Sequence, residues 1–191
     1  MSSVLAHAAA GITAYLCSNT WADKRSRWAL TPFVFLAICP DLDYVAVWWF
    51  GYVPHPRFTH SLLFALVAAV TVHAATRSSR TARFPAIWLI AAAASHGILD
   101  LLVGAHAVPL LWPLPAEIQM PIGVLPSAGA LKIGNYYLWR NLVIELGLML
   151  PMYTAMVLLC QGAVRRCHRV MALTLSPAWI GQLVWSVSLS R

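Results

Sequence analysis

Charged residues are scarce in this sequence, and acidic residues are the scarcest. Charged side chains make up 10% of the chain, while 60% of its residues are hydrophobic and the mean hydropathy is +0.71. Soluble domains carry about 25% charged residues. The shortage of charge therefore excludes an ordinary soluble domain and predicts an integral membrane protein. The 191 residues fit an all-α, polytopic transmembrane helix bundle of about five to six helices.

Several familiar catalytic and redox motifs are also missing. The chain has no Gly-rich phosphate loop, no G-x-S-x-G and no H-E-x-x-H, so serine hydrolase and zincin chemistry have no motif support. Its four cysteines show no C-x-x-C spacing, and we assign them no function. No basic stretch precedes the first apolar segment, so we expect no cleavable signal peptide of the usual kind.

Long apolar segments alternate with short polar connections. We expect membrane segments over residues 4–20, 28–39, 58–76, 84–103 and 137–161, and a short interfacial helix over 44–50. The apolar tail, residues 170–190, either spans the membrane or lies at its interface. A single membrane domain over 1–191, with its core in about residues 1–150, is the simplest organisation.

The net charge of +7 comes from basic clusters between the apolar segments. Three residues lie in the second and fourth connections or at their edges: Arg57, Lys132 and Arg140. Nine lie in the other connections: Lys24, Arg25, Arg27, Arg77, Arg80, Arg83, Arg165, Arg166 and Arg169. Because positive connections stay cytoplasmic, the N-terminus is expected outside. We interpret the clusters as topology signals rather than as a nucleic-acid surface.

Unusual polar groups come from five segments and reach the same, outer side at similar depth. His7 lies near the outer end of its segment, with Gly11 on the same helical face, where a missing side chain allows close approach. The full set is His7, Asp41, Asp43, His60, His96, Asp100 and Glu145. It includes four of the six carboxylates of the chain. Ionisable groups at membrane depth are costly, so this convergence predicts a functional site.

Mixed histidine and carboxylate ligands suit Zn²⁺, or Mn²⁺ and Fe²⁺. His96 and Asp100 are four residues apart, so on a helix they share one face. Asp41 and Asp43 are two apart, and only an irregular helix end, which Pro40 favours, would aim both at one centre. The ligands number more than four, so two or more metal ions are possible. Adjacent ions bridged by an aspartate would activate a water and clamp a phosphoryl or acyl oxygen.

The remaining polar residues near this side have two interpretations each. Arg57 lies three residues before His60 and would either bind a phosphate or anchor at lipid headgroups. His55 in a Pro-rich turn and His106 in the long outer connection are each more typical of structural or solvated residues when taken alone.

The order of these motifs resembles the membrane-bound metal-dependent hydrolases, the LexA-regulated, YdjM-like inner-membrane family of bacteria. The motifs are His7 with Gly11, Pro40-Asp41-Leu42-Asp43, Arg57-Phe58-Thr59-His60-Ser61, His96-Gly97-Ile98-Leu99-Asp100 and Pro109-Leu110-Leu111-Trp112-Pro113. The resemblance implies a metal site in a bacterial inner-membrane protein. That family usually has histidine directly before the arginine, whereas this chain has Pro56 there and His55 one residue earlier.

A weaker resemblance is to zinc-dependent phospholipases C. His96 to Asp100 matches the H-x-x-x-D helix of those enzymes, and His106 follows it as a further histidine. Asn141 to Glu145 would match a later H-x-x-x-E element, with asparagine in place of histidine. This comparison implies a multinuclear zinc site that cleaves phosphoesters of lipids.

These observations lead to a membrane-bound metal-dependent hydrolase as the main hypothesis. Its substrate would be a lipid or lipid-linked phosphoester, attacked by a metal-activated water. Asp41 or Asp43, with His60, His96 and Asp100, would bind the first metal, and His7 with a bridging Asp100 the second. The expected metal ligands are His7, Asp41, Asp43, His60, His96, Asp100, His106 and Glu145, and the expected catalytic residues are Asp41, Asp43, Arg57, His60 and Asp100.

Two other functions fit the same residues. A metal transporter or sensor would use the cluster to carry or report an ion, although transport sites usually lie near the membrane midplane. A structural membrane protein would use the His–Asp pairs only to lock its bundle. In every case the expected partners are membrane lipids and not nucleic acid.

Overall fold

The computed structural model describes residues 3–20, 28–51, 55–77, 84–127 and 134–189. Over these residues the chain is all α, as predicted, with an isolated antiparallel bridge between Val108 and Ile118. The helices are α1 (Val4–Cys17), α2 (Thr31–Ile38), η2 (Cys39–Leu42), α3 (Asp43–Phe50), η3 (Phe58–His60), α4 (Leu62–Arg77), α5 (Ala86–Val103), α6 (Tyr136–Cys160) and α7 (Arg166–Ser188).

Three of these helices are long and apolar enough to cross a membrane: α5, α6 and α7. The helices α1, α4 and the α2–η2 unit are apolar but shorter. The tail expected over 170–190 is thus part of a 23-residue helix that begins at Arg166 and has the length and composition of a span. Six basic residues of the charge pattern lie outside the described residues: Lys24, Arg25, Arg27, Arg80, Arg83 and Lys132. The orientation of the N-terminus therefore stays a prediction.

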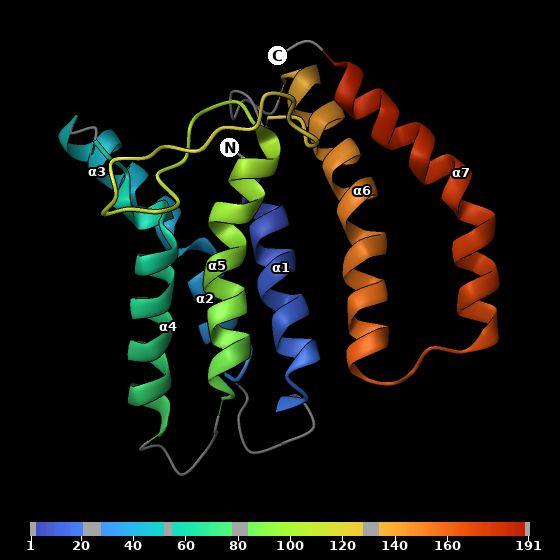
Figure 1. Ribbon diagram of the computed structural model, residues 1–191, viewed down its shortest axis with the longest axis horizontal. Helices are drawn as coiled ribbons and strands as arrows, with labels where there is room; N and C mark the ends of the chain where they lie inside the picture. The colour runs from blue at the N-terminus through green and yellow to red at the C-terminus, as the bar shows by residue number, and fades with distance from the viewer. Residues whose placement is uncertain (1–2, 21–27, 52–54, 78–83, 128–133, 190–191) are drawn as a thin grey trace.

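Small residues let α1, α2, α4 and α5 pack closely as one group (Figure 1). A side chain at Gly11 would bring its Cβ within 2.7 Å of the Phe33 carbonyl oxygen, so α1 and α2 meet backbone to backbone. This confirms the close approach expected at Gly11. Phe33, Leu36 and Leu89 are fully buried between these helices, and their apolar contact holds the group together.

The ligand-bearing segments all begin or end at the same end of the bundle, the upper end in Figure 1. The long connection after α5 runs across this end, and backbone hydrogen bonds fix it there. Leu62 N–H donates to Leu110 O at 3.0 Å, and Val124 N–H donates to Leu102 O at 2.7 Å. The connection therefore covers the polar end of the group.

His60 was expected in the first turn of a helix starting near Phe58, and this expectation is wrong. Phe58–His60 instead forms a separate 3₁₀ turn, and α4 begins at Leu62. The cause is Ser61, which has an extended backbone (φ −87°, ψ 154°) and accepts the Phe64 N–H on its Oγ at 3.1 Å. This is the geometry of a helix N-cap, so the helix can only start after Ser61.

Candidate metal centre

Four donor atoms from three parts of the chain form a closed ring at the polar end of the bundle. Asp41 Oδ1 lies 3.8 Å from His60 Nε2 and 3.6 Å from His96 Nε2. Asp100 Oδ2 lies 3.5 Å from the same His60 atom and 3.7 Å from the same His96 atom. Asp41 comes from η2, His60 from η3, and the other two from α5. Irregular helix ends and one regular helix thus converge on a single point.

Three of these atoms are buried and have no hydrogen-bond partner among the described residues: Asp41 Oδ1, His60 Nε2 and His96 Nε2. A buried polar atom left unpaired costs about 1–3 kcal/mol. Three such atoms that face one another therefore make an expensive arrangement unless something binds between them. Lone pairs of two imidazoles and a carboxylate are ligands for a divalent cation, not for an anion.

The distances fit such a cation. Ligand atoms about 2.0–2.2 Å from a tetrahedral ion lie roughly 3.3–3.6 Å from one another. The observed separations of 3.5 to 3.8 Å need only a small contraction to reach that range. The ligand atoms of two overlapping trios, His60–His96–Asp100 and His7–Asp41–His96, lie mutually within 4.8 Å. These buried groups could therefore hold a metal ion.

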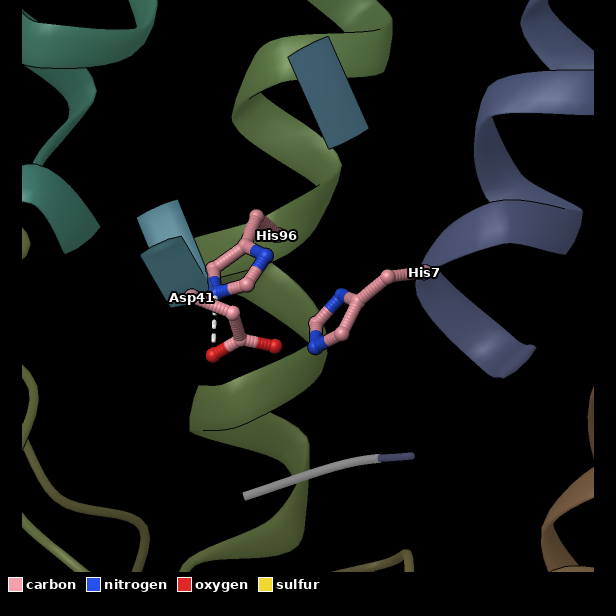
Figure 2. Close-up of side chains that lie close together, drawn as sticks. All are labelled: His7, Asp41 and His96. Carbon is pink, nitrogen blue, oxygen red and sulfur yellow. Dashed lines mark ion pairs between the residues drawn. The ribbon is translucent and has the colours of Figure 1, made fainter. Parts of the chain in front are cut away.

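His96 is fixed in the tautomer that a metal ligand needs. Its Nδ1 lies 2.8 Å from the Ala37 carbonyl oxygen, and because a carbonyl only accepts, Nδ1 must donate. The Nε2 atom then carries the lone pair, and it points toward Asp41 (Figure 2). The ring is fully buried, so α2 and α5 together set its orientation.

His60 is oriented by a chain of polar side chains. Thr59 Oγ1 lies 3.2 Å from Asp43 Oδ2 and 3.1 Å from His60 Nδ1. If Thr59 donates its one hydrogen to the Asp43 carboxylate, it accepts from His60 Nδ1–H, which leaves Nε2 free as a ligand. Arg57 completes the chain, with Nε and Nη2 donating to the two carboxylate oxygens of Asp43. Such outer partners fix the ring and raise its basicity.

Arg57 is therefore engaged with protein groups. Besides its two bonds to Asp43, its Nη1 donates to the Tyr44 hydroxyl at 3.1 Å, and the guanidinium lies 4.4 Å from the centre of the Tyr44 ring. Burial opposes the charge, but the hydrogen bonds and charge of Asp43 outweigh it, so the pKa of Arg57 lies above its usual value. Arg57 stays cationic and holds Asp43 in place.

His7 brings α1 to the centre. Its Nε2 lies 3.6 Å from Asp100 Oδ1, the oxygen that does not face His60 and His96. The His7 ring also stacks on the His96 ring, with 3.9 Å between centroids and 14° between planes. Figure 2 shows His7, Asp41 and His96 pointing toward one another from three separate segments. Asp100 thus offers one oxygen to each side, as a bridging carboxylate would.

The other sequence-predicted ligands lie around this group. Both oxygens of the buried Glu145 accept the Ser3 N–H, at 3.0 and 3.2 Å, so Glu145 ties α6 to the start of α1. Asp43 pairs with Arg57, as described above. His106 is exposed in the connection after α5, and His55 is exposed before η3. None of these four belongs to the two close trios. The ligand roles of Glu145, Asp43 and His106 stay predictions, and so does the structural or solvated role expected of His55.

An all-α fold with three helices long and apolar enough to cross a membrane, and a buried His–Asp cluster, defines a membrane protein of a type that could bind metal. The model of the YdjM inner membrane protein family matches residues 1–184, and the chain belongs to this family. The family resemblance predicted from the motifs is confirmed, and it extends well beyond the first 115 residues. No curated protein and no solved structure matches the chain.

Sequence reasoning did not identify the groups that orient the ligands. Thr59 lies inside a motif that it quoted, and a hydroxyl directly before a candidate histidine is the signal that would have identified it. The Ala37 carbonyl gave no signal, because every residue has one and only the packing of α2 on α5 aims it. The tether between Glu145 and Ser3 likewise depends on how α6 lies against α1.

Proposed function

We propose that this protein is a membrane-bound metal-dependent hydrolase whose substrate is a lipid or lipid-linked phosphoester. One observation carries the proposal: Asp41, His60 and His96 turn unpaired buried donor atoms toward one point. A structural lock would pair these atoms with each other by hydrogen bonds. The distances of 3.6 and 3.8 Å are too long for that and suit a shared ion.

Each residue of the centre has a defined task in this proposal. Asp41, His60, His96 and Asp100 Oδ2 hold the first cation, and His7 with Asp100 Oδ1 holds a second. Zn²⁺ is the metal that best suits nitrogen and carboxylate ligands in this number, with Mn²⁺ or Fe²⁺ as the alternatives. A divalent cation, when bound, supplies a Lewis acid and an activated water. The Asp43–Thr59 chain keeps His60 Nε2 turned inward.

The place of the centre supports the proposed substrate class. It lies at one end of the bundle of a chain that belongs to an inner-membrane family, under a connection rich in apolar residues and proline. Substrates that reside in the bilayer reach such a site without leaving the membrane. The H-x-x-x-D pattern of His96 and Asp100, shared with zinc-dependent phospholipases C, supports a phosphoester as the bond cleaved. Arg57 as a group that orients the phosphate stays a prediction.

The proposal is tested by turnover in reconstituted vesicles. The protein is inserted into phosphatidylglycerol vesicles, and water-soluble phosphate products are followed by ³¹P NMR with Zn²⁺, with a chelator, and after zinc is restored. We expect turnover that the chelator abolishes and zinc restores. Asp41→Asn should remove it, while Glu117→Gln, which changes an exposed carboxylate in the outer connection, should not.

The same vesicles separate the alternatives. Zinc accumulation inside the vesicles without lipid turnover would replace the hydrolase by a transporter. A wild-type protein without activity or bound metal, in which Asp41→Asn lowers only thermal stability, would leave the structural lock as the function.

A further inference from the structure

A cavity of about 840 Å³ lies beside the metal centre at the same end of the bundle. Its wall includes Gly104, which follows the last residue of α5, the first turns of α6 and the C-terminal end of α7. Gly104 is four residues after Asp100, which is about 6 Å along a helix axis. The cavity is therefore a neighbour of the metal centre, yet none of the candidate ring ligands lines it.

One side of this cavity carries a cation, Arg140, that has no carboxylate partner among the described residues. Arg140 Nε donates a hydrogen bond to the Asn141 side-chain oxygen at 3.0 Å, and the guanidinium lies 5.1 Å from the centre of the Tyr137 ring. Among the described residues no carboxylate pairs with Arg140, and the described lining contains no aspartate or glutamate. Arg57 offers the contrast, since Asp43 neutralises it. The Arg140 charge thus borders a cavity whose described lining residues carry no negative charge.

The other parts of the lining suit an amphiphile. Ile122, Val187 and Leu189 contribute apolar surface, whereas Gln119 and Asn141 contribute amides. Gln119 Nε2 donates to Gly104 O and Asn141 Nδ2 donates to Ser127 O, so both amides brace the wall. Tyr136, Tyr137 and Trp139 are exposed beside the cavity, and such aromatic residues gather at the membrane–water interface. A ligand that combines a negative head with an apolar body matches this wall.

We propose that this cavity binds the headgroup of an anionic phospholipid, with its phosphate on Arg140. Arginine binds phosphate oxygens through parallel N–H donors, and the bond to Asn141 uses only Nε of Arg140. Ile122, Val187 and Leu189 receive the first part of the acyl chains. The site is distinct from the metal centre and does not depend on whether that centre hydrolyses lipid.

Native mass spectrometry of the detergent-solubilised full chain tests this site. Dihexanoyl phosphatidylglycerol, dihexanoyl phosphatidylcholine and inorganic phosphate are titrated separately, with a chelator present so that no metal-dependent turnover occurs. We expect the wild type to bind phosphatidylglycerol about tenfold more tightly than phosphatidylcholine, as one charge-assisted contact allows. Arg140→Gln should remove this preference. Arg166→Gln at the opposite end of α7 should retain it.

A second variant keeps the charge of Arg140 and reduces the space in the cavity. Val187→Trp narrows the cavity on its apolar side, so it should lower binding of both lipids while thermal unfolding stays close to that of the wild type. Equal affinity of the wild type for both lipids would overturn the proposal, and so would an unchanged preference in Arg140→Gln. Inorganic phosphate that competes with phosphatidylglycerol at equal concentration would also overturn it, because the apolar wall would then contribute nothing. Failure of the hydrolase proposal, in contrast, would appear only in the turnover assay.

Discussion

Helices α1, α2, α4 and α5 form one region, and α6 with α7 forms another, and the two are held together differently. In the first, backbones meet at small residues such as Gly11, and α1 alone buries seven of its residues. In the second, α6 buries four residues, three of which share an apolar core cluster with Ala10 of α1 and Leu99 of α5, whereas α7 buries only Ser186. It is joined to its neighbours by side chains that donate to carbonyl oxygens, such as Trp179 to Leu148 at 3.0 Å.

The two regions contribute differently to the candidate metal centre. The candidate metal centre uses the ends of short helices and 3₁₀ turns, because only an irregular chain can aim Asp41 and His60 at the point where α5 aims His96 and Asp100. Close packing around that point keeps the donor atoms in place. The long helices α6 and α7 lie to one side of this group, with α6 beside α1 and α7 beyond α6 (Figure 1), and they contribute to neither close trio. Substitutions should therefore change metal binding in the first region far more than in the second.

The largest effect is expected at Asp100. Its two oxygens face different histidines, so Asp100→Asn should abolish binding of both ions, whereas His7→Ala should abolish only the second. Plasma mass spectrometry measures the number of metal ions bound per chain in each variant. Equal residual metal in the two variants would show that Asp100 does not bridge.

The next effect concerns the groups that orient His60. Thr59→Val removes the hydroxyl between His60 and Asp43 and keeps the shape of the side chain. We expect the affinity for Zn²⁺ to fall roughly 10–100-fold, as for other outer partners of metal ligands. Competition with a fluorescent chelator measures it. Thr174→Val, which loses a similar hydroxyl on exposed α7, is the matched control and should retain wild-type affinity.

A pair of glycines compares packing in the two regions. A Cβ at Gly97 would lie 2.7 Å from the His60 carbonyl oxygen, whereas one at Gly181 would meet open space. Gly97→Ala should therefore destabilise the protein by about 1–3 kcal/mol through overpacking. Gly181→Ala should be neutral or stabilising by up to about 1 kcal/mol through helix propensity. Thermal unfolding in detergent measures the stability of both variants. A Gly97→Ala variant more stable than Gly181→Ala would refute the close packing of α5 on η3.

The smallest effect is expected between α6 and α7. Trp179→Phe removes the hydrogen bond to Leu148 O and keeps most of the apolar contact. Polar contacts between membrane helices contribute about 0.6 kcal/mol on average, so the loss in unfolding free energy should be of that order. A fluorescent label at the end of α7 reports the unfolding of this helix and so provides the measurement. Complete detachment of α7 from α6 in the variant would mean that this one hydrogen bond holds the two helices together.

Much of the fold could be predicted because apolar runs and their lengths report helices directly. The centre was predictable in composition, since ionisable residues such as His7, His96 and Asp100 stand out against apolar neighbours. The contacts that orient these residues could not be predicted. The sequence predicted a helix from residue 58 that includes His60, whereas the cap at Ser61 leaves His60 in a separate turn. The partners of Asp43 and Glu145 come from distant segments, and local spacing carries no information about them.

The central claim is that Asp41, His60, His96 and Asp100 hold a divalent cation. X-ray absorption at the zinc edge of the purified, zinc-loaded protein tests it most directly. The account predicts at least one ion per chain, with nitrogen and oxygen ligands at about 2.0–2.2 Å and the outer scattering of two imidazoles. This signal should be lost in His60→Ala/His96→Ala and kept in Glu117→Gln. A wild-type protein that retains no zinc, or zinc surrounded only by oxygen without imidazole scattering, would contradict the account.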